Sequence, residues 1–67
     1  MTIPEQIDRN IALQTALVDA SIALDNTIAT SPEEFEHFTD TSLALDRAIE
    51  YLQKERETLK AQVRAIA

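Results

Sequence analysis

The chain has 67 residues and no cysteine, and twelve acidic against six basic side chains give it a net charge of −6. This length allows one domain at most, and the missing cysteines exclude disulfides and thiolate metal sites. The acidic balance argues against binding to nucleic acid or to anionic membranes, because both partners attract basic surfaces. With no glycine and two prolines, few turns are expected, which favours an all-α fold.

The first helix is predicted over residues 3–29. Thr2 suits the N-cap, Pro4 fits the first turn, and Glu5 can complete a capping box. Two apolar stripes flank a polar line on this helix. One stripe holds Ile7, Ile11, Val18 and Ile22, the other holds Leu13, Leu17 and Leu24, and the polar line holds Asn10, Gln14, Ser21 and Asp25. Two interpretations fit: a bundle interior with satisfied polar groups, or one stripe packing within the hairpin while the other binds a second chain.

A short link at residues 30–31 precedes a second predicted helix over residues 32–66. Ser31 suits its N-cap, Pro32 its first position, and Glu34 the capping box. Residues 39–42 are four poor helix formers, but a heptad pattern continues through them and favours one unbroken helix. The heptad positions are Phe35, Phe38, Ser42, Leu45, Ile49, Leu52, Arg56, Leu59, Val63 and Ile66.

A link this short predicts an antiparallel two-helix hairpin, a coiled coil occupying residues 1–67 as one domain, or a four-helix bundle if two hairpins pair. Ser21 and Ser42 would face each other and let the helices approach closely. The end of the second helix, from Leu59 through Ile66, is expected to extend past the first helix and to need cover from another chain. Arg56 on the seam either fixes register and partner choice or extends to water beyond the first helix.

Candidate chemistry is sparse in this sequence. His37 is the single histidine, and Glu33 one turn earlier makes an ordinary surface pair with it rather than a metal site. There is no glycine-rich phosphate loop and no serine–histidine pairing that the helices would bring together. We therefore expect no enzyme activity, no metal and no cofactor.

The motif Pro32-Glu33-Glu34-Phe35-Glu36-His37-Phe38 is followed by Ser42, Ala44-Leu45-Asp46 and Ala48-Ile49. Residues 32–52 thereby resemble the small E-type chaperones of needle subunits in type III secretion systems, which are helical hairpins of about this length. The first helix is similar to theirs in length and amphipathicity only. The resemblance implies pairing with a larger helical-repeat co-chaperone, and joint action to keep the needle subunit monomeric in the cytoplasm.

The heptad pattern predicts a small cytoplasmic adaptor or chaperone that buries an apolar helical face against a partner protein, as a homodimer or hetero-oligomer. The N-terminal residues have neither the basic start nor the apolar core of a secretory signal. The alternatives are a self-associating four-helix bundle and a small acidic inhibitor of the phage type. The predicted partner-binding residues are Phe38, Leu43, Leu45, Ile49, Tyr51, Leu52, Leu59, Val63 and Ile66.

Overall fold

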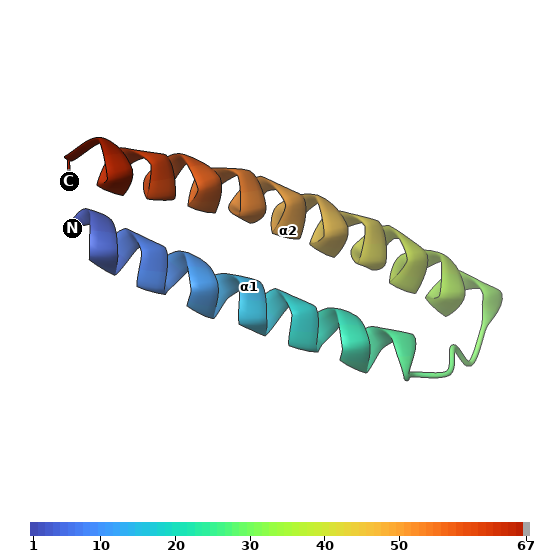
Figure 1. The fold of residues 1–67 in the computed structure, drawn as a ribbon. Helices are drawn as coiled ribbons and strands as arrows, with labels where there is room; N and C mark the ends of the chain where they lie inside the picture. Colours follow the sequence, from blue (N-terminus) through green and yellow to red (C-terminus); the bar gives the residue numbers. More distant parts are fainter. Residues whose placement is uncertain (67) are drawn as a thin grey trace.

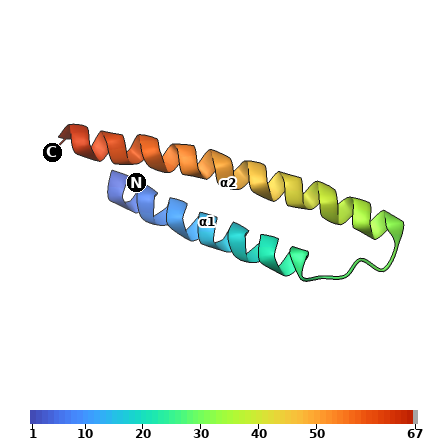
Figure 2. The ribbon, with the colours of Figure 1, turned by 45° about the vertical axis from the view of Figure 1, so that its right-hand side comes forward.

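The computed structural model describes residues 1–66, which form two helices joined by one link (Figure 1). Helix α1 spans Ile3–Asp25 and helix α2 spans Pro32–Ile66. The helices run antiparallel, and the two ends of the chain lie at the same end of the molecule in both views (Figures 1 and 2). The molecule is a rod of 53 × 16 × 14 Å. The prediction of an all-α helical hairpin is confirmed.

Both helix starts have side-chain caps. The Thr2 hydroxyl accepts a hydrogen bond from the Glu5 backbone N–H at 3.3 Å, and the Ser31 hydroxyl accepts one from the Glu34 N–H at 3.1 Å. The Glu34 carboxylate reaches back to the Thr30 N–H at 3.2 Å, one residue earlier than an ordinary capping box. These bonds satisfy N–H groups that a helix start leaves without an intrahelical acceptor.

The first helix ends at Asp25, four residues earlier than predicted, so the link covers residues 26–31 rather than 30–31. The Asn26 N–H bonds to the Ile22 carbonyl, and the Thr27 hydroxyl donates to the Ala23 carbonyl at 2.7 Å. These contacts close the last turn of α1. A tight reversal needs a residue with positive φ, usually glycine, and residues 1–66 contain none. The chain therefore uses six residues to turn.

Helix α2 continues without a break through residues 39–42. The hydroxyls of Thr39 and Thr41 donate to the carbonyls of Phe35 and His37 at 3.0 and 2.9 Å. Because each hydroxyl bonds one turn back within the helix, it does not pull the backbone into another conformation. The heptad pattern was thus a better guide here than helix propensity.

The helices pack along one heptad line on each partner. The line on α2 matches the predicted seam from Phe38 to Leu59, with Leu52 and Leu59 buried. The packed line on α1 coincides with neither of the two predicted apolar stripes. It runs between them and contains three residues of the predicted polar line, Asn10, Gln14 and Ser21, but not Asp25. Its members, all buried or half-buried, are Ile3, Ile7, Asn10, Gln14, Leu17, Ser21 and Leu24. Ser21 and Ser42 are both half-buried on these lines, at matching levels of the hairpin.

Leu59 corrects one expectation about the end of α2. It is 5% exposed and belongs to the core of the hairpin, whereas Val63 and Ile66 are exposed as expected. Side chains of a helix lean toward its N-terminus, so Leu59 leans toward the body of the hairpin. α1 begins at Ile3, which is early enough to cover it.

Candidate protein-binding surface

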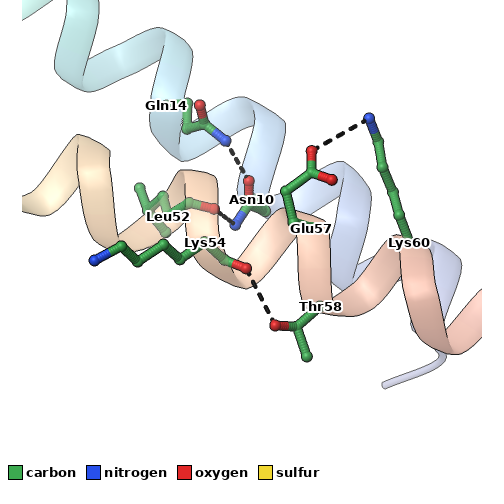
Figure 3. A network of polar contacts seen from close by, with 7 residues as sticks. All are labelled: Asn10, Gln14, Leu52, Lys54, Glu57, Thr58 and Lys60. Carbon is green, nitrogen blue, oxygen red and sulfur yellow. Dashed lines mark hydrogen bonds and ion pairs between the residues drawn. The ribbon is translucent and has the colours of Figure 1, made fainter.

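A polar layer interrupts the apolar packing near the open end of the hairpin (Figure 3). Asn10 is 1% exposed, and its Nδ2 donates to the Leu52 carbonyl at 2.8 Å and to Glu55 Oε1 at 3.1 Å. The Gln14 Nε2 donates to Asn10 Oδ1 at 2.6 Å. Asn10 is therefore satisfied, as a buried amide must be to avoid a large penalty. One of the two interpretations of the sequence, an interior with satisfied polar groups, describes Asn10, although the sequence did not single this residue out. Its heptad spacing from Ile3 and Leu17 is the signal that does so.

Arg56 lies beside this layer, on the packed line of α2. It is half-buried, and its Nε is buried with no hydrogen-bond partner in residues 1–66. It lines a hollow with Ile11, Thr15 and Val18, so α1 has not ended at its level. The idea that Arg56 reaches water past the end of the first helix is thus wrong. The hairpin thus supplies no hydrogen bond to offset the burial of this N–H group.

The residues that directly follow packed positions form one side of the hairpin. In antiparallel helices these positions fall on the same side of both partners, which agrees with a hollow lined by Leu24, Asp25, Thr39 and Leu43. We name the uncharged stretch of this side the isoleucine face. It consists of Ile11, Thr15, Val18 and Ile22 from α1 and Thr39 and Leu43 from α2, all exposed. It carries four of the eleven large apolar side chains that are exposed within residues 1–66.

The residues that directly precede packed positions form the opposite side, which we name the alanine face. It consists of Leu13, Ala16, Ala20 and Ala23 from α1 and Thr41, Ala44, Ala48 and Tyr51 from α2. A hollow here is lined by Leu13 and Tyr51 together with Gln6, Arg9 and Glu55. The sequence predicted both Leu43 and Tyr51 as partner-binding residues, and they line hollows on opposite sides of the hairpin.

The structure divides the predicted partner-binding residues into two groups. One group packs between the helices and is buried or half-buried there: Phe38, Leu45, Ile49, Leu52 and Leu59. The other group is exposed: Leu43, Tyr51, Val63 and Ile66. Val63 and Ile66 border a shallow apolar hollow with Ile3 and Pro4 at the open end of the hairpin. The exposed residues Ile11, Val18 and Ile22 were known from the sequence as a stripe but were not predicted as binding residues.

Within residues 1–66, charged side chains on the surface form only local pairs. Glu50 and Lys54 lie 3.4 Å apart, and Glu57 and Lys60 lie 3.9 Å apart, one helical turn along α2 in each case (Figure 3 draws the second pair). His37 Nε2 lies 3.9 Å from Glu33, with both side chains exposed. Pairs as exposed as these contribute little to stability.

The remaining chemistry of residues 1–66 is limited. They contain no group of three or more His, Cys, Asp or Glu side chains arranged to hold a metal ion. Neither helix, as far as the structure describes it, is both long and apolar enough to cross a membrane. Comparisons of the chain with protein-family models, with curated proteins and with solved structures gave no match. The two faces of the hairpin are therefore its most distinctive surface features.

Proposed function

We propose that this chain is a helical-hairpin adaptor, cytoplasmic and soluble, that binds another protein by packing its exposed apolar side chains against that partner. One observation carries the proposal. Among residues 1–66, eleven large apolar side chains are exposed, whereas the apolar residues that the hairpin buries are Leu52 and Leu59. Single exposed apolar residues are ordinary, but a face of them marks an interaction site.

The surface area supports the same conclusion. The chain exposes 5136 Å². A folded monomer of 7.5 kDa exposes about 4,250 Å² on average. The elongated shape accounts for part of the excess of about 900 Å², and a stable protein interface covers about 800 Å² on each partner. One interface of ordinary size would therefore bring the exposed area down to that of a compact protein.

The most specific form of the proposal is a chaperone of a secretion needle subunit. It rests on the resemblance of residues 32–52 alone. In this form the hairpin joins a helical-repeat co-chaperone and shields apolar surface of the client by helix-on-helix packing.

A second candidate is a four-helix bundle made from two copies, and the alanine face favours it. Six of its eight positions are alanine or threonine, and the charged residues Arg9 and Glu55 lie only at the end near Leu13 and Tyr51. Small side chains let helices approach closely, so two such faces can pack against each other along their alanine positions.

The proposal is tested by recovery of a partner from the native cells with tagged chains. Val18→Asp and Tyr51→Asp place a charge on the isoleucine and alanine faces, and Ala12→Asp places one on the outward side of α1 as a matched control. We expect wild type and the control to recover the same protein in stoichiometric amount, and at least one face variant to lose it while its circular dichroism stays helical. Equal recovery by all variants, or no recovery by any, would contradict the proposal.

A further inference from the structure

The isoleucine face has the dimensions of a binding site for one helix. Ile11, Val18 and Ile22 are 41%, 41% and 53% exposed, and Leu43 is 51% exposed. With Thr15 the residues on α1 follow steps of four, three and four, so they form a straight uncharged strip parallel to the packed line. The strip from Ile11 to Ile22 is about 17 Å long at 1.5 Å per residue. That length fits about three turns of a partner helix.

Acidic residues surround this strip. Asp8 and Asp25 lie at its two ends on α1, Asp19 borders its middle, and Asp46 follows a packed position on α2. None of these four forms an ion pair within residues 1–66. The basic residue that touches the strip is Arg56, which is half-buried at the end near Ile11. Arg9 lines the hollow of the alanine face instead. The rim of the strip is therefore negative over most of its length.

These charges determine which partners can bind here, because the apolar strip alone would not distinguish between them. A second copy docked face to face would bring the same aspartates together across a symmetric interface, between two chains that each carry a net charge of −6. Anionic membranes and nucleic acids are repelled by the same rim. A basic segment gains attraction from it, and such complementarity raises both the association rate and the specificity.

We infer that the isoleucine face binds an amphipathic helix of another protein, with apolar residues at steps of three and four flanked by Lys or Arg. This inference rests on the proposed adaptor function and names the chemistry of the partner. The partner's apolar residues lie on Ile11, Val18, Ile22 and Leu43, and its basic residues meet the aspartates at the rim.

The experiment uses two labelled helical peptides of eighteen residues with identical apolar positions, one flanked by Lys and one by Glu. Fluorescence anisotropy with the full chain measures each affinity at 50 and at 300 mM NaCl. We expect the Lys peptide to bind, to lose at least tenfold in affinity at the higher salt, and to bind at least tenfold more tightly than the Glu peptide at the lower salt. Equal affinity for the two peptides, or affinity independent of salt, overturns the inference.

Paired variants locate the binding. Val18→Ser with Ile22→Ser removes apolar contact without adding charge, and Ala16→Ser with Ala20→Ser is its control on the alanine face. Asp25→Asn with Asp46→Asn removes two rim charges, and Glu33→Gln with Asp40→Asn removes two charges from the outward side of α2. We expect the affinity for the Lys peptide to fall at least fivefold in each variant of the isoleucine face and less than twofold in each control. An equal loss of affinity in a variant and its matched control overturns the inference.

Two further results separate this inference from the adaptor function. A homodimer in sedimentation that Val18→Ser with Ile22→Ser disperses would show that a second copy occupies the face, and would overturn the inference. If excess Lys peptide does not reduce recovery of the cellular partner, the inference is overturned but the adaptor function stands. Competition by the Lys peptide but not by the Glu peptide supports both.

Discussion

At the scale of single residues, Asn10 sets the alignment of the two helices. Its amide donates to two groups of α2, the Leu52 carbonyl and the Glu55 carboxylate, and it accepts from Gln14 on α1. A slip of the helices by one heptad would place Ala48 or Gln62 where Glu55 now lies, so the carboxylate acceptor of Asn10 would be lost in either direction. A hydrogen bond to a charged group contributes more than a neutral one, so the observed register is favoured.

Replacing Asn10 tests this role. Asn10→Ala removes the partner of Gln14 Nε2 and leaves a small void, so we expect the free energy of unfolding to fall by about 1–3 kcal/mol. Urea unfolding followed by circular dichroism at 222 nm measures the change. Gln53→Ala is the control, because Gln53 is exposed on α2 and makes no side-chain hydrogen bond within residues 1–66. Equal stability of the two variants would show that the polar layer adds nothing.

At the scale of elements, the start of α2 is the most strongly specified point of the chain. Ser31 and Thr30 together with Glu34 satisfy the first turn, Pro32 stands where its missing N–H is harmless, and Glu33 and Glu34 complement the helix dipole. The link between the helices holds few other contacts. The position at which the chain reverses therefore depends on this cap.

Loss of the cap should destabilise the hairpin measurably. We expect Ser31→Ala to lower the free energy of unfolding by about 1 kcal/mol, because the Glu34 N–H loses its acceptor, and Ser31→Asp to leave it nearly unchanged. Thermal unfolding of both variants beside wild type gives the comparison. A decrease of the same size in Ser31→Asp would mean that the hydroxyl acts in some way other than capping.

Helix α2 and its seam could be predicted from the sequence because local and long-range signals agree there. The cap at Ser31 and the heptad from Phe38 to Leu59 point to the same helix. The end of α1 could not be placed, because no glycine or proline stands at Asn26 and the terminating bonds come from a threonine hydroxyl and backbone groups. The packed line of α1 could not be singled out for a different reason. The sequence allowed an interior with satisfied polar groups, but which polar residue is buried depends on the hydrogen-bond acceptors that α2 provides to Asn10.

At the scale of the whole molecule, the hairpin is a thin acidic rod with a small core. The molecule is 53 Å long, and its two helices share one line of contacts. Polar groups interrupt that line at Asn10, Gln14 and Arg56. The three ion pairs are exposed and local to α2. The net charge of −6 therefore acts mainly as repulsion between like charges, which opposes the folded state.

Salt should consequently stabilise this protein. Raising NaCl from 10 to 200 mM shortens the Debye length from about 30 Å to about 7 Å and screens that repulsion, so we expect the melting temperature to rise. Asp19→Lys with Asp40→Lys reduces the net charge to −2, since each change adds two units to −6, and should show a smaller rise. A melting temperature that falls with salt would mean that attractive ion pairs dominate.

Because residues 1 and 66 lie at the same end of the rod, the hairpin has a particular mechanical geometry (Figure 1). A force pulling these two ends apart acts across the helices rather than along them, so it separates the helices progressively from the open end toward the link. The layer at Leu59 would carry the load first and the Asn10–Leu52 layer next, with the link strained last. Layers that open one after another yield at low force, so a neighbour pulling on both ends could separate the helices and expose the residues packed between them.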